Sequence, residues 1–452
     1  MKLQTLFVAA ALSAPLIAQD LLPKAAPQAQ PIVLEHATLH TIDGGVVLDG
    51  TIWFEGGIIR GVLARDEKLK LPEGSAAPLR INLRGKHVFP GMISAHTSLG
   101  LIEIGQVPQS VDTDELGDLS PEASALTAIN PDSTAIPVAR RNGVLAAVVY
   151  PTGGLLPGRA AAVQLDGWTN RDMAVRASAG PVVAWPSSRS GRWRRAGGGG
   201  GGGGSRDDAK RVTREIAKID GAFLDARAWL TARTNDPSVP LDVRHDALVP
   251  ALRGEVPVLI LAQSSEQIAA AVQWGQQRKL RIVIVGGHEA RSVAALLREH
   301  DVPVVIDGVH RLPRRDDAAY DEPFTLARDL ERAGVMFCIA SGEDYSNDRN
   351  LPYHAATAAA YGLDRRTALA AVTLRVAEIF GLADRLGSLA VGKDATLFVA
   401  DGHPFELSSS VEQAFVQGRT VDLRSKQTEL AQKYRERYRQ SAADKQRKKS
   451  GK

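Results

Sequence analysis

Cysteine is almost absent from this chain of 452 residues, and its scarcity excludes two kinds of structure. The single thiol, Cys338, cannot form an intramolecular disulfide framework or a metal site built from several cysteines. It lies in the apolar segment 335–340, where we expect a buried and inert thiol. The sequence also lacks the Gly-x-Ser-x-Gly motif of serine hydrolases and a phosphate-binding loop. The sequence therefore supports neither a serine-hydrolase mechanism nor a phosphate-binding loop.

A large excess of charge is also absent. The formal net charge is +4, and basic clusters at 433–439 and 445–449 account for much of it. Such a tail can contact nucleic acid or an anionic membrane, but we favour a solvated helix end. We therefore expect a small-molecule ligand and no nucleic-acid partner, and we leave open a homo-oligomer or association with a related protein.

The one long apolar run lies at the N-terminus. Lys2 precedes the largely apolar segment 3–17, and Ala18 marks a plausible cleavage point. The run is too short for a membrane-spanning helix. We interpret residues 1–18 as a signal peptide and 19–30 as a linker, and we expect a periplasmic or secreted protein. The alternative is an N-terminal hydrophobic helix packed on the domain.

Two kinds of sequence pattern occur along the rest of the chain. Short strands broken by glycines occupy 31–88 and return at 387–424, which predicts one β-sandwich domain built from both ends. Between them, over 89–386, apolar runs of four to six residues alternate with helical stretches. Repeated β–α units predict a parallel sheet, either a (β/α)₈ barrel or an open doubly wound sheet. Residues 425–452 form the basic tail.

Eight consecutive glycines at 197–204 interrupt the barrel region. Polyglycine cannot bury apolar surface and has a high conformational entropy, so we expect a flexible loop. We favour a neutral low-complexity expansion over an active-site lid.

The segment His87–Leu101 carries the most specific pattern. A Pro-Gly turn precedes a short apolar run that ends at His96, and Ser98 follows two positions later. This resembles the first barrel strand of the amidohydrolase superfamily, in which a His-x-His pair points to one side of the strand and binds metal. Further matches to an imidazolonepropionase-like branch lie at 129–132, 150–154, 156–159, 286–290, 350–356 and 387–395.

The resemblance implies a barrel fold, a zinc or other divalent ion, and hydrolysis of a carbon–nitrogen bond other than a peptide bond. It assigns His96 and His288 as metal ligands and Asp344 or Glu343 as the catalytic carboxylate. Ser98 and Gln263 stand where relatives carry imidazoles, and neither is a strong zinc ligand.

Two functions follow from this damaged ligand set. The first is a hydrolase with a reduced metal site made of two imidazoles and one carboxylate. The second is a barrel that binds no metal and serves as a binding or partner protein without catalysis. A fold alone does not decide between them.

Overall fold

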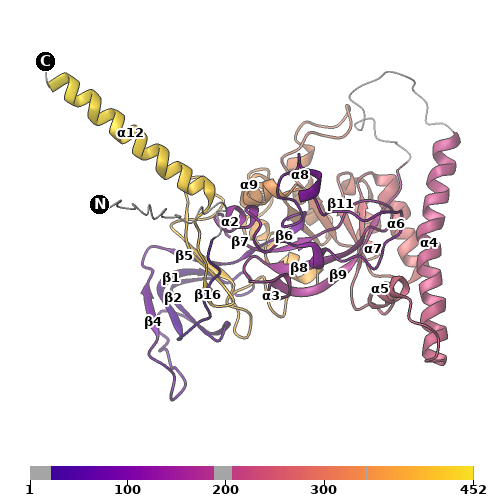
Figure 1. Cartoon of the computed structure of the whole chain (residues 1–452), viewed down its shortest axis with the longest axis horizontal. Helices are drawn as coiled ribbons and strands as arrows, with labels where there is room; N and C mark the ends of the chain where they lie inside the picture. Colours follow the sequence, from indigo (N-terminus) through magenta and orange to yellow (C-terminus); the bar gives the residue numbers. More distant parts are fainter. Residues whose placement is uncertain (1–21, 188–205, 343, 451–452) are drawn as a thin grey trace, which may run out of the picture.

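Two separate sheets organise the molecule. The computed structural model describes residues 22–187, 206–342 and 344–450, so the predicted signal peptide, the polyglycine run and Glu343 lie outside the described residues. Figure 1 shows one sheet near the two chain ends and the other at the centre of the molecule. The predicted α/β barrel with a second β domain from both chain ends is confirmed.

The central sheet forms a nearly closed barrel. Its strands follow one another in chain order, from β6 beside β7 to β12 beside β13, and β13 lies next to β6. The strands are β6 (Met92–Thr97), β7 (Val144–Val149), β8 (Gly158–Gln164), β9 (Ala174–Ala184), β10 (Val258–Ala262), β11 (Ile282–Gly286), β12 (Val304–Asp307) and β13 (Phe337–Ala340). Nearly every residue of β10 to β13 is buried, which explains their unbroken apolar sequences.

One strand departs from the predicted parallel arrangement. Strand β8 pairs antiparallel with both β7 and β9. Only residues 150–157 join β7 to β8, with no crossover helix, and a parallel pairing needs a much longer connection. The prediction of parallel pairing was therefore wrong for this strand.

Helices cover the outside of the barrel. The sequence predicted helical stretches between the apolar runs, and the structure has helical segments between β10 and β11, between β11 and β12, and between β12 and β13. The shorter helices are η1 (Pro108–Ser110), α1 (Ala125–Ala128), α2 (Ala135–Arg140), α3 (Asn170–Met173), η2 (Ala290–Val293), α7 (Ala294–Glu299), η3 (Tyr345–Asn350), α10 (Arg365–Ala370) and α11 (Leu374–Ile379). The longer ones near the barrel are α5 (Val243–Leu252), α6 (Ser265–Arg278), α8 (Glu322–Arg332) and α9 (Leu351–Ala360).

The second sheet joins the two ends of the chain. It contains β1 (Ile32–His40), β2 (Val46–Glu55), β3 (Ile58–Leu63), β4 (Leu79–Asn82), β5 (His87–Pro90), β14 (Leu397–Ala400), β15 (Val411–Val416) and β16 (Arg419–Thr420). The order is β16-β15-β14-β5-β1-β2-β3, with β4 paired to β1. Its core includes Leu34, Phe54, Val88 and Phe415. Because β5 lies directly before β6 in the chain, this sheet anchors the start of the barrel.

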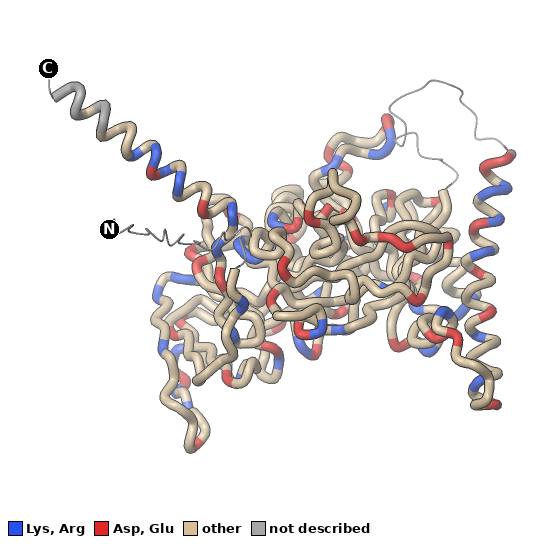
Figure 2. Tube along the Cα trace, viewed as in Figure 1, with Lys and Arg blue, Asp and Glu red and all other residues tan. Residues whose placement is uncertain are grey.

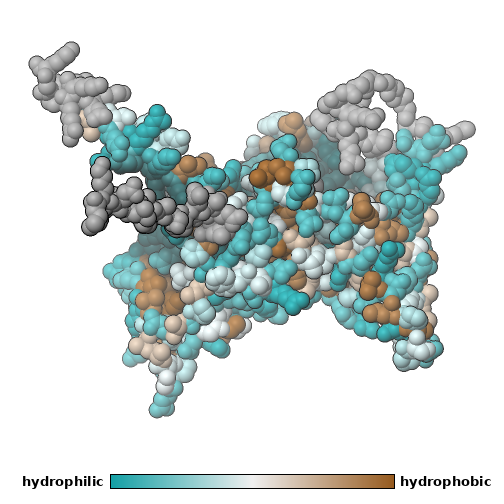
Figure 3. Space-filling view, in the orientation of Figure 1, coloured by the Kyte–Doolittle hydropathy of each residue, from teal (hydrophilic) through white to brown (hydrophobic). Residues whose placement is uncertain are grey.

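Two long helices extend from the body (Figures 1 and 2). Helix α4 (Arg206–Asn235) buries Ile219, Phe223 and Ala226, and the Phe223 ring meets Trp274 of α6. Helix α12 (Lys426–Ser450) carries the basic tail and is largely exposed and hydrophilic (Figure 3). Among the described residues, no helix combines the length and apolar character needed to cross a membrane.

Candidate functional site at the barrel mouth

His96 is held in the barrel interior at the end of β6. Every residue of β6 is buried, and alternation along the strand places the His96 side chain at the carboxyl ends of the barrel strands. Its Nδ1 lies 3.1 Å from Oδ1 of Asp307, the last residue of β12. The two side chains are 5% and 13% exposed. Strands that are distant in sequence therefore bring an imidazole and a carboxylate together in a nearly closed space.

His288 lies just after β11 and contacts the main chain of Asp307. It follows Gly286 and Gly287, and its Nε2 lies 3.2 Å from the main-chain oxygen of Asp307. Because a carbonyl only accepts hydrogen bonds, Nε2 carries the proton and Nδ1 carries the lone pair. Nδ1 is buried and has no hydrogen-bond partner among the described residues. Burial first, and then the charge of Arg311, lowers the pKa of His288 to about 4, so the ring is neutral at neutral pH.

Asp307 is the centre of this group. Burial favours its protonated form, but His96, His288 and Arg311 together outweigh burial and lower the pKa of its carboxyl. The carboxylate is therefore ionised at neutral pH. The sequence interpretation missed Asp307, although a signal existed: it is the polar residue that ends the apolar run 304–306, at the barrel end where functional residues collect.

Tyr150, directly after β7, completes the wall beside His96. The two rings meet edge to face with centroids 4.5 Å apart. Burial, followed by the charges of Cys338 and Asp307, raises the pKa of the phenol well above its usual range, so the hydroxyl stays protonated. Its Oη is buried and has no hydrogen-bond partner in the described part of the chain. The hydroxyl is therefore available to a ligand group.

Ser98 and Gln263, which stand where the resemblance implies imidazoles, also lie at this end of the barrel. Ser98 follows β6 and is buried. Gln263 follows β10, and its amide packs over Gly286, where a Cβ atom would collide with it. Gly286 has φ +106°, a conformation that glycine adopts readily. The Oε1 of Gln263 is buried with no partner among the described residues.

Asp348 is a second buried carboxylate, and it contacts the strand that carries His96. Asp348 is fully buried and accepts hydrogen bonds from Ser94 Oγ at 2.5 Å, Thr97 Oγ1 at 2.6 Å and Ser341 Oγ at 2.9 Å. Burial raises the pKa of Asp348 to about 6, although the three hydroxyls oppose this shift. Asp348 thereby ties η3 to β6 and to the residue after β13, and the sequence interpretation did not identify it.

The structure describes one of the two predicted catalytic carboxylates, Asp344. Asp344 is exposed, and its side chain accepts a hydrogen bond from Ser346 N at 2.9 Å as the N-cap of η3. The structure thus brings His96 and His288 together at Asp307 and places Asp344 in a helix cap. Glu343 lies outside the described residues.

Two further histidines brace the loop after β12. These residues are His310 and His354. In the structure His354 Nδ1 accepts from Val309 N at 2.9 Å, and the two rings stack with centroids 4.1 Å apart. Both contacts fix the chain just after Asp307.

The described donors do not form a metal centre. No group of three or more His, Cys, Asp or Glu residues within the described ranges is arranged to hold an ion. The cationic Arg311 also acts on both His288 and Asp307, and a nearby positive charge disfavours a divalent ion. The described residues therefore do not fit the ion that amidohydrolase-type barrels commonly use.

Comparisons with known proteins agree with this architecture. A family model described as the amidohydrolase family matches residues 280–421, from β11 to the second sheet. Amidohydrolase tasK of Hapsidospora irregularis is 23% identical over 399 residues, 82% of this chain and 40% of that protein. The chain thus spans about two fifths of the length of that relative.

Solved structures share the fold. An amidohydrolase from Thermotoga maritima MSB8 superposes with a TM-score of 0.74 at 24% identity, covering 87% of this chain and all of that one. A prolidase complexed with N-methylphosphonate-L-proline gives 0.54 at 17% identity, covering 87% and 99% of the two chains. The chain therefore shares the fold of these structures, and its residues 280–421 resemble the amidohydrolase family.

Proposed function

We propose that this protein hydrolyses a carbon–nitrogen bond other than a peptide bond at the carboxyl end of its barrel. One observation carries the proposal: His96 and His288 come from different strands and meet at the ionised Asp307. Such convergence of buried titratable groups is typical of active sites. The match of residues 280–421 to the amidohydrolase family model supports the hydrolase class.

Each group has a role that its hydrogen bonds allow. Asp307 accepts from His96 Nδ1 and fixes the orientation of that ring. His288 Nδ1 holds a lone pair that accepts a hydrogen bond from the attacking water. The Tyr150 hydroxyl donates to the oxygen on which negative charge develops. No step in this proposal passes through a metal ion.

A second candidate is a binding protein without hydrolytic activity. Within the described ranges no three donors are arranged to hold an ion, and this favours the second candidate because the resemblance implies hydrolysis assisted by a metal. The two candidates share the barrel mouth and differ only in turnover.

The deciding experiment combines binding with turnover. Purified protein is incubated with an aryl amide, a phenylurea and a hydantoin, and product formation is followed beside elemental analysis for zinc. We expect slow hydrolysis of at least one compound, lost in Asp307→Asn and retained in the exposed control Asp66→Asn. Binding of a compound without any product would instead establish the second candidate.

We also propose that the protein is exported. The support is the N-terminal sequence, with Lys2 before the apolar segment 3–17. Intact-mass measurement on protein from its native source should give a mature chain that begins near Gln19. A chain that retains Met1 would contradict export by cleavage of this segment.

A further inference from the structure

Arg311 is a partly buried cation without an ion-pair partner among the described residues. Its Nε and Nη2 are both buried and make no hydrogen bond within the described part of the chain. The bond found for this guanidinium is a long one, 3.4 Å, from Nη1 to the main-chain oxygen of Leu312. Arg140, another buried arginine, instead lies 3.1 Å from the Asp166 carboxylate. Burying an unpaired charge is costly, so an unpaired guanidinium indicates a missing anion.

The acidic residues around Arg311 leave it unpaired. The charges of Glu322, Asp307 and Glu289 act on the guanidinium, yet no ion pair within 4.0 Å links it to a described carboxylate. Asp307 is engaged by His96. The Oε2 of Glu289 accepts from Ser265 N, and its Oε1 is buried without a hydrogen-bond partner in the described part of the chain. Burial, the largest effect, lowers the pKa of Arg311 to about 10, so it remains charged at neutral pH.

The two unpaired nitrogens are the part of arginine best suited to a carboxylate. Nε and one terminal nitrogen form a planar fork whose two N–H groups match the two oxygens of a carboxylate. A phosphate fits less well here, because its nearly double charge would lie close to the ionised Asp307. The site therefore favours a single negative charge with two oxygens.

We propose that Arg311 binds the carboxylate of a small-molecule ligand at the barrel mouth. This inference deepens the proposed function and rests on the same site. Arg311 lies four residues after Asp307, which ends β12, and its main-chain N donates to Val309 O at 2.9 Å. The ligand's carboxylate meets Nε and Nη2, and a second polar group of the ligand is assigned to the unpartnered Tyr150 hydroxyl or His288 Nδ1 at the same end of the barrel. The ligand class is thus a carboxylic acid that carries a second polar group.

Entry to this site requires a local movement. The unpaired atoms of Arg311 are closed to solvent, while Leu312 and Tyr320 on the same connecting segment are 85% and 77% exposed. The segment between β12 and α8 begins at Gly308, which has φ +78°. Displacement of this segment opens the fork to a ligand.

The experiment uses matched acid and amide probes. Benzoate with benzamide, N-acetylglycine with its amide, and succinate with succinamide are titrated by calorimetry against the full chain, together with inorganic phosphate. We expect at least one acid to bind about tenfold or more tightly than its amide, because a charge-assisted pair is lost in the amide. Arg311→Gln should remove this preference, and Arg314→Gln, an exposed arginine nearby, should retain it.

Three results would overturn the proposal: no acid preferred over its amide, phosphate preferred over every acid, or an unchanged preference in Arg311→Gln. Thermal unfolding without added ligand gives an independent test. Arg311→Gln should raise the melting temperature because it removes an unpaired buried charge, whereas a lower value together with unchanged binding identifies a structural role. Neither measurement needs turnover, so failure of hydrolysis and failure of anion binding remain distinguishable.

Discussion

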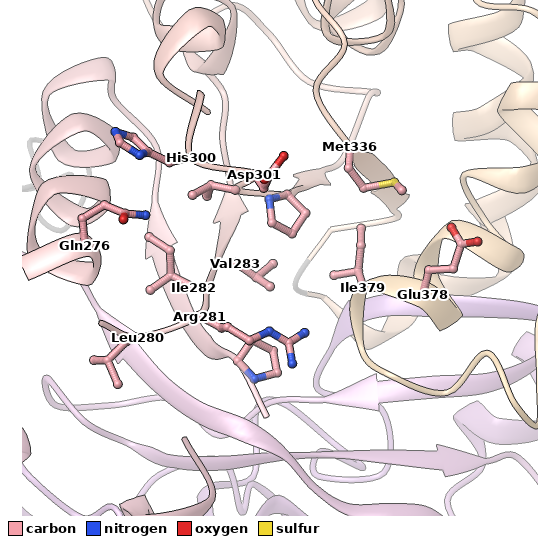
Figure 4. A pocket seen from close by; sticks show the side chains of 13 residues that line it. Gln276, Leu280, Arg281, Ile282, Val283, His300, Asp301, Met336, Glu378 and Ile379 are labelled. Atoms are coloured by element: carbon pink, nitrogen blue, oxygen red, sulfur yellow. The ribbon is translucent and has the colours of Figure 1, made fainter. Parts of the chain in front are cut away.

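A cavity at the amino ends of four barrel strands and the proposed site at the carboxyl ends differ in how their polar side chains are satisfied. At the amino ends of β10 to β13 a cavity of about 390 Å³ is lined by residues that include Arg281, His300, Asp301 and Glu378 (Figure 4). None of its lining side chains has a buried atom without a partner within the described ranges. At the carboxyl ends, Tyr150 and other residues keep such atoms in a nearly closed space. The largest difference between the two places is thus not in volume: the proposed site holds buried polar atoms without partners among the described residues, and the side chains that line the cavity hold none.

The strongest test of this contrast compares one aspartate from each end. Asp307→Asn removes the charged acceptor of His96 and should lower any hydrolytic rate by about 10³-fold, as expected for loss of acid–base assistance. Asp301→Asn, at the opposite end, should stay within about twofold, since asparagine tolerates the φ of +50° at this position. Initial rates on the compound that is hydrolysed measure both. Equal losses would mean that the carboxyl end holds no special chemistry.

The next effect concerns stability and pH. The pKa of Asp348 rises from 3.8 to about 6 on folding, so the folded protein holds this proton more tightly than the unfolded chain. This contribution to stability is complete below pH 3.8 and is lost as the pH rises through 6, a change of about 3 kcal/mol. Asp348→Asn should therefore be more favourable, relative to wild type, at pH 7.5 than at pH 4.

Urea denaturation at both pH values measures the difference, with Asp66→Asn as an exposed control. If the wild-type and Asp348→Asn proteins keep the same difference in unfolding free energy at both pH values, the carboxyl does not titrate as proposed.

A smaller effect is expected from two glycines with similar backbone angles. Gly286→Ala should cost about 2 kcal/mol because the new Cβ collides with the Gln263 amide and φ is +106°. Gly392→Ala, with φ +93° and no atom within 4 Å of the new Cβ, should cost about 1 kcal/mol from the backbone alone. Chemical denaturation of both variants measures the two costs. The reverse order would show that the Gln263 side chain does not occupy this place.

The smallest expected change is in metal binding. Ser98→His combined with Gln263→His adds two strong ligands beside His96 and His288, and should raise zinc affinity about tenfold. Arg311→Gln added to this pair should raise it further by removing a nearby positive charge. Calorimetry with zinc alone measures both steps. Tight stoichiometric zinc in the unmodified protein, lost in His288→Ala, would instead establish a reduced metal site.

The sequence predicted the parts of this molecule that depend on local pattern. Apolar runs such as 258–262 predicted the barrel strands. The second group of short strands at 387–424 predicted the sheet formed by both chain ends. His96 and His288 were singled out because they end or follow such runs. Asp307 was missed because its role depends on its distance from His96, 211 positions away in the chain. The unpaired state of Arg311 is likewise a property of burial, and no motif encodes it.

The meeting of both chain ends in one sheet has a consequence for the order of folding. Strand β5 pairs with β1 on one side and with β14, more than 300 residues later, on the other. Until residues 397–400 have been synthesised, one edge of β5 has no neighbour, and open strand edges promote association with other chains. Contacts between such distant segments also form slowly. The first part of the chain therefore completes its sheet only when the last fifth of the chain has been made. Chaperones that delay folding would protect the open edge of β5 until β14 covers it.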